Sequence, residues 1–205
     1  ALSKEEKLAL YDKIQKKKEN DRAKRDVFTP HEGQLPIALS EAKIRFVSAA
    51  NGFGKTSYSV NELKWAMEGF NPIRNEYTKC PCTVVVVLDS PAKVKDVWTK
   101  ELSKWYNLEK LQQNKNGHPY VTEWVWPNGS ITKFMFHEQN DLAFESIEID
   151  GGVIYDEIPS RNIFVALSRG QRTKGSKPFQ LLIGTPTHAA WARVDLYEVW
   201  ERGEN

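Results

Sequence analysis

Apolar residues along this chain fall into short continuous runs separated by segments with helical spacing. The runs at residues 43–48 (KIRFVS), 83–88 (TVVVVL), 151–157 (GGVIYDE) and 179–187 (FQLLIGTPT) predict strands. The run 83–88 lies between two prolines and is rich in valine, which is typical of a strand buried on both faces of a parallel sheet. We expect the strand at 43–48 to be buried as well.

Helical spacing appears in three places between or after these runs. Val60, Leu63, Met67 and Phe70 predict a helix that buries one face. Residues 91–106 and the tail from Ala189 show the same periodicity. Residues 121–136 instead read as two strands joined at an Asn-Gly turn, which predicts a β-hairpin. This alternation predicts an α/β three-layer fold on a mainly parallel central sheet with an inserted hairpin.

The amino-terminal part has a different character. Residues 3–26 carry few apolar positions and many charges, so we expect residues 1–27 to form a polar helical arm. Residues 28–205 then form one domain, a size that supports a hydrophobic core. No apolar run approaches the roughly 18 residues that span a bilayer, and we expect no membrane association.

Composition adds three smaller expectations. Cys80 and Cys82 are too few for a disulfide framework or a zinc site, so we expect free thiols in a reducing compartment. The four histidines show no metal-ligand spacing. We expect the tryptophans to pack in the core or the hairpin, including Trp98, Trp105, Trp124, Trp126 and Trp200.

Charge is distributed unevenly, although the formal net charge is only +2. Between Glu157 and Asp195 there is no acidic residue, but there are six basic ones. Such a segment suits a polyanion, either nucleotide phosphate or nucleic-acid backbone, and the alternative is a solvated loop.

The stretch AANGFGKTSYS at residues 49–59 is the first candidate for chemistry. It lacks the first glycine of the pattern G-x-x-x-x-G-K-[ST], which Ala49 replaces. It nevertheless follows a predicted strand and precedes a predicted helix, as a phosphate-binding loop does. Lys55 would reach the β- and γ-phosphates of a nucleotide, and Thr56 would offer its hydroxyl to Mg²⁺. The predicted nucleotide-binding residues here are Ala50, Asn51, Gly52, Phe53, Gly54, Lys55, Thr56 and Ser57.

Two consecutive carboxylates follow the predicted strand at 151–157. A phosphate-loop ATPase needs one acid near the magnesium ion and often a second acid to polarise the attacking water. We assign Asp156 to Mg²⁺, directly or through water, and Glu157 to the role of general base. The alternative is an acidic turn at a strand end.

Two further positions complete the candidate site. Thr185 follows the apolar run 181–183, where a polar side chain can sense the γ-phosphate and couple its state to motion. Gln34 lies upstream of the loop, and its amide can pair with both the donor and the acceptor edge of adenine. Phe28 could pack on the adenine ring. A turn residue and a loop glutamine are the plain alternatives.

Taken in order, these motifs resemble the ATPase domain of large terminase subunits, the DNA-packaging motors of tailed bacteriophages. The resemblance covers about residues 28–200. It comprises an adenine-binding motif (FTPHEGQ), a deviant phosphate loop (AANGFGKT), an apolar-Asp-Glu motif and a Thr-Pro coupling motif. It implies a P-loop NTPase of the ASCE type that uses ATP and Mg²⁺. Pro159 departs from the small residue that the family usually has soon after the acids.

The resemblance also implies partners and a location. It implies ATP-driven translocation of double-stranded DNA into a procapsid by a homo-oligomeric ring, expected to be a pentamer, on the portal protein. A small terminase subunit would bring the DNA. The protein would act in the host cell cytoplasm, attached transiently to the procapsid, and would not be part of the mature virion. The family's carboxyl-terminal nuclease domain is expected to be absent, because no acidic cluster suited to two metals follows Glu157.

Phosphoryl transfer normally requires a charge-stabilising arginine, supplied by the same chain or by a neighbour. Residues 75–160 contain no arginine. The candidates are therefore Arg161, Arg169 and Arg172, of which we favour Arg169 and Arg172. Contact with the DNA backbone is the rival role for the same segment.

Three other functions remain open on sequence. A helicase-like nucleic-acid translocase would carry similar motifs but would need a second motor-like domain. A small-molecule kinase would need a lid and an acceptor pocket, which no motif marks. A non-catalytic nucleotide-binding module would have no turnover to lose when Glu157 is replaced by glutamine.

Overall fold

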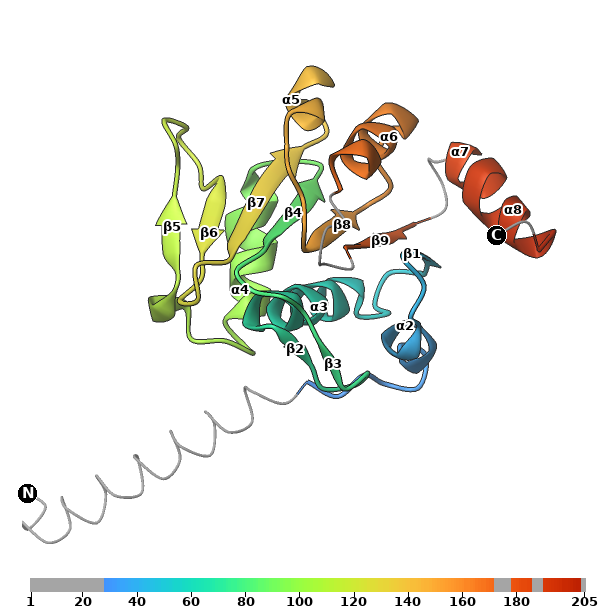
Figure 1. Ribbon diagram of the computed structural model, residues 1–205, viewed down its shortest axis with the longest axis horizontal. Coiled ribbons are helices and arrows are strands. Elements are labelled where there is room, and N and C mark those ends of the chain that lie inside the picture. Colours follow the sequence, from blue (N-terminus) through green and yellow to red (C-terminus); the bar gives the residue numbers. More distant parts are fainter. Residues whose placement is uncertain (1–27, 172–177, 186–189, 204–205) are drawn as a thin grey trace, which may run out of the picture.

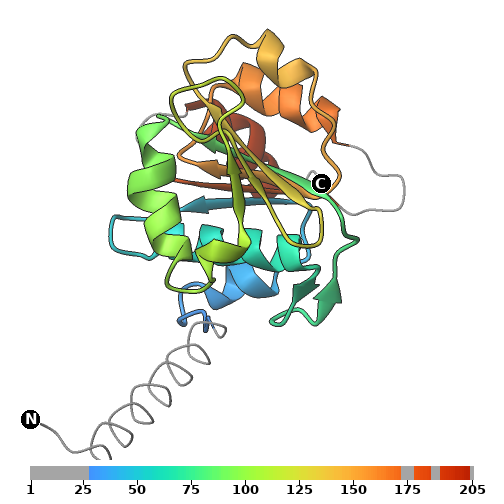
Figure 2. The same cartoon turned by 90° about the vertical axis from the view of Figure 1, so that its left-hand side faces the viewer.

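The computed structural model describes residues 28–171, 178–185 and 190–203. The predicted arm at 1–27 lies outside these residues. Seven strands form the central sheet in the order β1-β9-β8-β4-β7-β6-β5, with helices on both faces (Figures 1 and 2). The strands are β1 (Ile44–Ser48), β4 (Thr83–Leu88), β5 (Gln112–Asn114), β6 (Glu123–Val125), β7 (Ile131–Phe136), β8 (Gly152–Asp156) and β9 (Phe179–Gly184). The predicted α/β three-layer fold is therefore confirmed.

The parallel part of the sheet runs from β1 to β7. β9 pairs with both β1 and β8, and β4 pairs with both β8 and β7, all in parallel. The strand that precedes the GKT loop is thus separated from the strand that ends in Asp156 by one intervening strand, β9. This order brings the carboxyl ends of β1, β9 and β8 to one edge of the sheet, where open α/β sheets bind their ligands.

The inserted hairpin is confirmed in β6 and β7, which pair antiparallel. Its turn closes where the Gly129 N–H donates to the Trp126 carbonyl, with Gly129 at a φ of 84°. β5 adds a further antiparallel edge strand that the sequence pattern did not predict. Its three polar residues, at 112–114, carry no apolar signal.

The core lies on both faces of the sheet, as the valine-rich run predicted. Val84, Val86 and Leu88 of β4 face a cluster that includes Leu63 of the helix after the GKT loop. The alternate residues Val85 and Val87 face the second cluster, together with Ile163 and Leu167. Full burial of each such side chain contributes about 1.5–3 kcal/mol.

Helices cover the two faces unequally (Figure 2). On the first face lie α2 (Leu35–Leu39), α3 (Lys55–Glu68), the π-helical segment η1 (Val94–Thr99) and α4 (Lys100–Leu102). On the second face lie α5 (Leu142–Glu145) and α6 (Arg161–Gly170). The short helix η2 (Leu108–Lys110) precedes β5.

Two expectations about burial were wrong. α3 was expected to bury one face, but all of its residues from Tyr58 to Met67 are buried. A small hairpin of β2 (Phe70–Asn71) and β3 (Glu76–Tyr77) follows α3, and Arg74 between its strands donates to the Ala38 carbonyl of α2. Conversely, β1 was expected to be buried, but it is an edge strand whose one partner among the described residues is β9, and it buries only alternate positions.

The carboxyl-terminal segment is helical, as predicted, over α7 (Ala190–Ala192), η4 (Arg193–Tyr197) and α8 (Glu198–Glu201). Trp191 anchors it: its indole ring packs on Phe164 at 5.1 Å and its N–H donates to the Pro159 carbonyl. Trp200 is 66% exposed, so the expectation that it packs in the core was wrong. No helix among the described residues is both long and apolar enough to cross a bilayer.

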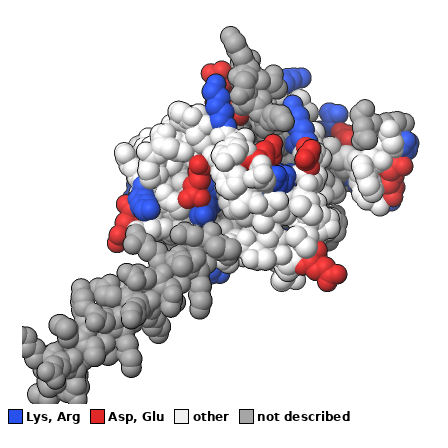
Figure 3. All heavy atoms as spheres, turned by 60° about the horizontal axis from the view of Figure 1, so that its bottom comes forward, with Lys and Arg blue, Asp and Glu red and all other residues white. Residues whose placement is uncertain are grey.

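In the folded chain, part of the positive charge of the acid-free segment at 158–194 is neutralised. Arg161 pairs with Asp195, and Arg193 pairs with Glu198, so acids from the carboxyl-terminal helix neutralise two of its cations. Acidic and basic side chains are likewise interspersed on the face drawn in Figure 3. Arg172, Lys174 and Lys177 lie outside the described residues. Cys80 and Cys82 are free thiols, as expected.

Candidate active site

The GKT loop connects the end of β1 to the start of α3, as a phosphate-binding loop requires. Gly54 is the residue before the helix and has a φ of 79°, in the left-handed region that favours glycine. The first N–H groups of α3 have no carbonyl partners within the helix and point toward the loop. This helix start therefore offers N–H groups and a positive dipole end to an anion.

Gln34 lies under this loop and is 2% exposed. Its Nε2 donates to the carbonyls of Phe53 and Gly54, at 3.2 and 3.1 Å, and its Oε1 accepts from the His31 N–H at 3.3 Å. The amide that was predicted to pair with adenine is instead buried against the loop, and backbone groups occupy its donor and its acceptor. His31 adds a second support, because its Nε2 lies 2.9 Å from the Phe53 carbonyl oxygen.

Phe28 was predicted to pack on adenine, but the structure places it in the core. It is 9% exposed and packs against Trp65 and Trp105, with ring centroids 6.0 and 5.1 Å away. The aromatic rings beside the loop are instead those of His31 and Phe53, which meet edge to face at 5.1 Å. Sequence reasoning missed His31, although it sits within the FTPHEGQ motif.

The Lys55 ammonium group contacts both the GKT loop and Thr185, the residue after β9. Its Nζ donates to the Ala49 carbonyl at 2.7 Å and to the Ala50 carbonyl at 3.4 Å. It also lies 3.4 Å from the hydroxyl oxygen of Thr185, which is the residue directly after β9. The lysine ammonium and the predicted coupling residue are therefore neighbours, although 130 residues separate them in the sequence.

Glu157 follows β8 in an unusual backbone conformation. Its φ is 82°, a left-handed value that few residues other than glycine adopt and that stores strain. The conformation is held from β9: the Glu157 N–H donates to the Ile183 carbonyl at 2.8 Å, and its Oε2 accepts from the Thr185 N–H at 3.0 Å. Thr185 therefore contacts both Lys55 and Glu157.

Asp156 is the last residue of β8 and is 6% exposed. Its Oδ2 accepts a hydrogen bond from the indole N–H of Trp98 at 2.9 Å. Burial raises the pKa of the Asp156 carboxyl, while the Trp98 hydrogen bond and the Lys93 ammonium act in the lowering direction. Sequence reasoning assigned Trp98 to core packing alone. Its helical spacing correctly predicted burial, but spacing carries no information about the partner of an indole N–H.

The residues predicted to hold Mg²⁺ have suitable chemistry. Magnesium prefers oxygen ligands and usually binds through one or two carboxylates, substrate phosphates and waters. Oδ1 of Asp156 receives no hydrogen bond from any residue that the structure describes, so it can serve as such a ligand. Thr56 lies in the first turn of α3, which contacts β8. Ser57, by contrast, donates its hydroxyl to Glu101 of α4.

Of the candidate arginines, Arg169 lies away from this edge of the sheet. Arg169 is exposed in the last turn of α6. The helix ends beside Ile149, whose N–H donates to the Gly170 carbonyl before β8 begins. A five-residue strand is about 16 Å long, so Arg169 sits at the opposite edge from Lys55. Arg161 starts the same helix but pairs with Asp195. Arg172 lies outside the described residues.

His137 is another residue that the sequence did not single out. It follows β7. Burial lowers the pKa of the His137 imidazole, although the negative charge of Asp89 acts to raise it. Its Nε2 is buried with no hydrogen-bond partner among the described residues. Asp89 itself pairs with Lys93 at 3.0 Å.

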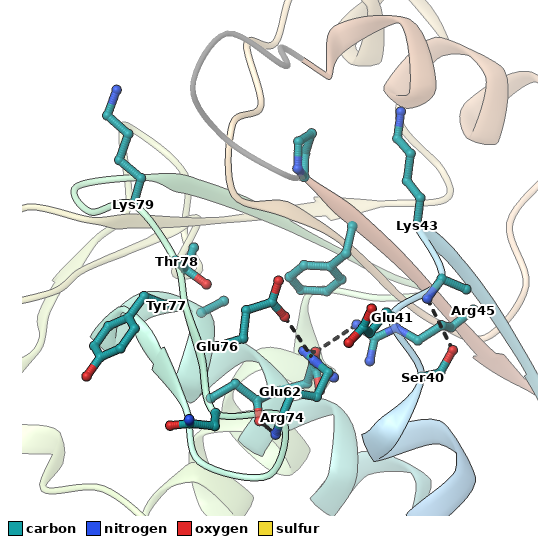
Figure 4. A pocket seen from close by; sticks show the side chains of 16 residues that line it. Ser40, Glu41, Lys43, Arg45, Glu62, Arg74, Glu76, Tyr77, Thr78 and Lys79 are labelled. Atoms are coloured by element: carbon teal, nitrogen blue, oxygen red, sulfur yellow. Dashed lines mark hydrogen bonds and ion pairs between the residues drawn. The ribbon is translucent and has the colours of Figure 1, made fainter.

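A wide cavity of about 1000 Å³ opens at the far edge of the sheet, away from the GKT loop. Its floor is a group of buried charges on three elements, in which Arg45 and Arg74 each lie 2.7 Å from Glu62 (Figure 4). Glu76 pairs with Arg74, whereas Lys79 extends away from the charged floor (Figure 4). Because Glu62 neutralises both arginines at hydrogen-bond distance, we interpret this group as structural.

The fold matches solved phage terminase structures. The large terminase of bacteriophage HK97 gives a TM-score of 0.60 at 13% identity, covering 87% of this chain and 38% of that chain. The large terminase of the thermophilic bacteriophage D6E in complex with ADP gives 0.57 at 14% identity, with coverages of 86% and 43%. The D6E protein in complex with ATP-gamma-S gives 0.52 at 11% identity, with coverages of 89% and 42%.

These likenesses establish a shared fold and confirm the resemblance at that level. The chain spans about two fifths of the length of the solved terminases that it matches. No protein-family model and no curated protein sequence matches the chain.

Proposed function

We propose that this chain hydrolyses ATP and is the motor domain of a large terminase that drives double-stranded viral DNA into a procapsid. One observation carries the proposal. Lys55, Thr185 and Glu157 form a continuous chain of hydrogen bonds at the edge where β1, β9 and β8 end. The fold likeness to large terminases crystallised with ADP and ATP-gamma-S supports the choice of nucleotide and of motor class.

In this proposal the residues of the loop bind the triphosphate. The N–H groups at the start of α3 and the Lys55 ammonium hold the β- and γ-phosphates. Thr56 and the Asp156 carboxylate would hold Mg²⁺, which would supply positive charge to neutralise charge that develops on the phosphates. On binding, Lys55 would exchange its contacts with the loop carbonyls for contacts with phosphate oxygens.

Glu157 then acts as the general base. It accepts a proton as the water oxygen bonds to the γ-phosphorus and the bond from that phosphorus to the β–γ bridging oxygen breaks. The products are ADP and inorganic phosphate. The Thr185 N–H orients the Glu157 carboxylate before the reaction. The Thr185 hydroxyl, through its contact with Lys55, couples movement of Lys55 to β9.

The remaining partners are part of the same proposal. A ring of identical subunits, with five as the expected number, would act on the portal protein, and a small terminase subunit would deliver the DNA. The complex would work in the host cytoplasm while attached to the procapsid. Arg169 or Arg172 would then serve a neighbouring subunit's nucleotide.

The test is an ATPase assay, with and without DNA and partner subunits, on the wild type, Lys55→Ala and Glu157→Gln. We expect Lys55→Ala to lose nucleotide affinity. Glu157→Gln should keep that affinity and lose at least about 10²-fold in turnover, because the carboxamide cannot accept the proton. A wild type that binds ATP without turnover under all these conditions would indicate a non-catalytic module, and strand separation by the chain alone would favour a helicase-like translocase.

A further inference from the structure

The segment at 94–105 touches both halves of the candidate active site. Trp98 of η1 donates to Asp156 at the end of β8. One turn later, Glu101 of α4 accepts from Ser57 in the first turn of α3 and from the Trp105 indole. The position of the Trp98 indole is therefore fixed relative to the phosphate loop as well as to the carboxylate.

The local backbone is specialised for this contact. Residues 94–99 form a π-helical segment, a rare structure that is frequent at functional sites. A π-helical turn holds one residue more than an α-helical turn, so it rotates every later side chain around the helix. The Thr99 hydroxyl secures the widened turn by donating to the Val94 carbonyl at 2.7 Å. Trp98 itself is completely buried.

We propose that Trp98 is a positioning residue, whose indole N–H holds Oδ2 of Asp156 so that Oδ1 faces the nucleotide-bound Mg²⁺. This inference rests on the proposed function. An indole N–H can only donate, so it fixes one carboxylate oxygen without competing for the metal. Partners of metal ligands of this kind commonly change metal affinity by 10–100-fold when they are lost.

The chain supplies two matched controls. Trp124 is also fully buried and packs on the same Phe134 ring as Trp98, but its N–H has no hydrogen-bond partner among the described residues. Trp126 is 2% exposed and donates to the Thr132 hydroxyl at 3.0 Å, away from Asp156. Phenylalanine at each of the three positions removes a buried indole, and only Trp98→Phe removes the contact with the carboxylate.

The experiment measures binding of a non-hydrolysable ATP analogue to each full-length variant, in EDTA and across a Mg²⁺ titration. We expect Trp98→Phe to keep the wild-type affinity for the analogue in EDTA. It should need about 10-fold more Mg²⁺ than the wild type to reach half of the Mg²⁺-dependent increase in that affinity. Trp124→Phe and Trp126→Phe should need the wild-type concentration. Electron paramagnetic resonance with Mn²⁺ in place of Mg²⁺ provides a direct reading of the metal.

If Trp98→Phe does not fold, benzothienylalanine at position 98 replaces only the N–H by sulfur and should give the same shift. A metal requirement equal to that of Trp124→Phe would overturn the inference and leave the proposed function intact. If nucleotide binding by the wild type does not depend on Mg²⁺, both the inference about Trp98 and the proposed function would be overturned.

Discussion

At the scale of single residues, the shape of the GKT loop depends on close approach between two segments. Gln34 donates to the loop carbonyls at Phe53 and Gly54 and reaches the loop only because Gly54 has no side chain. A Cβ atom built on Gly54 would lie 2.8 Å from the Gln34 Nε2 atom. The same addition at Gly52, which also has a positive φ, would meet nothing within 4 Å.

These two glycines give the first prediction. Alanine in a left-handed conformation costs about 1–2 kcal/mol at either position. Gly54→Ala should also displace Gln34 and so lower the melting temperature and the nucleotide affinity further than Gly52→Ala does. Thermal unfolding and nucleotide titration check this, and equal losses in both variants would show that Gln34 does not set the loop conformation.

Thr185 contributes through two different groups, which a substitution can separate. Its backbone N–H holds Glu157 and its hydroxyl contacts Lys55. Thr185→Val keeps the first contact and the side-chain shape but removes the second. We expect turnover to fall about 10-fold, the equivalent of one hydrogen bond to a charged group, with little change in stability. Thr185→Ser should retain wild-type kcat, and a valine variant with full activity would remove the hydroxyl from the mechanism.

At the scale of elements, α3 illustrates how a charged helix becomes fully buried. Glu62 is 1% exposed, yet it accepts from two arginines and from the Tyr58 hydroxyl. Burial acts to raise the pKa of the Glu62 carboxyl, but the positive charges and hydrogen bonds of Arg45 and Arg74 hold it below its ordinary value. These contacts tie α3 to β1 and to the β2–β3 hairpin.

Glu62→Gln should therefore destabilise the fold at neutral pH by about 3–5 kcal/mol, because it leaves two buried guanidinium groups without a counter-charge. The depressed pKa means that this stabilisation is present above the unfolded-state pKa and lost as the pH falls through the folded-state pKa. The difference between wild type and variant should thus shrink below about pH 4.

Urea unfolding as a function of pH measures this difference. Glu76→Gln is the control, since the Glu76 side chain is 42% exposed and an exposed pair contributes at most about 1 kcal/mol. A Glu62 effect that persists unchanged in acid would show that packing, not charge, is lost.

At the scale of the whole molecule, the sheet separates the GKT loop from Arg169. Lys55 and Glu157 lie where strands end, whereas Arg169 lies where β8 begins. Within one subunit the two groups cannot meet. Any role of Arg169 in hydrolysis therefore requires a second subunit, which agrees with the proposed ring.

This gives a prediction about assemblies. Arg169→Ala and Lys55→Ala should each abolish the hydrolysis of the assembled motor, because one lacks the donated charge and the other the phosphate contact. Mixing the two variants should restore part of the ATPase rate, since some interfaces would then combine an intact loop with an intact arginine. Arg161→Ala is the control, because Arg161 pairs with Asp195 within its own chain. Arg169→Ala with full activity would exclude this arginine.

The sequence by itself predicted the four parallel strands at 43–48, 83–88, 151–157 and 179–187, the helix after the GKT loop and the candidate chemical groups, but not β5, α6 or the β2–β3 hairpin. The valine-rich apolar run at 83–88, bounded by prolines, indicated a buried strand, and the apolar runs of β8 and β9 indicated strands that end in polar residues. The GKT loop, Asp156, Glu157 and Thr185 were found for the same reason: each is a local pattern of residue types beside a predicted strand end. Periodicity reports such local geometry directly.

Only the tertiary structure decided which of these groups meet, because contacts between distant segments leave no periodic trace in one sequence. It joined Lys55 to Thr185 and Glu157 through β9, and it gave the Trp98 indole a carboxylate partner. It also moved Phe28 into the core and set Arg169 at the far edge. Strand order and helix register, which depend on packing of the whole chain, determine all of these contacts.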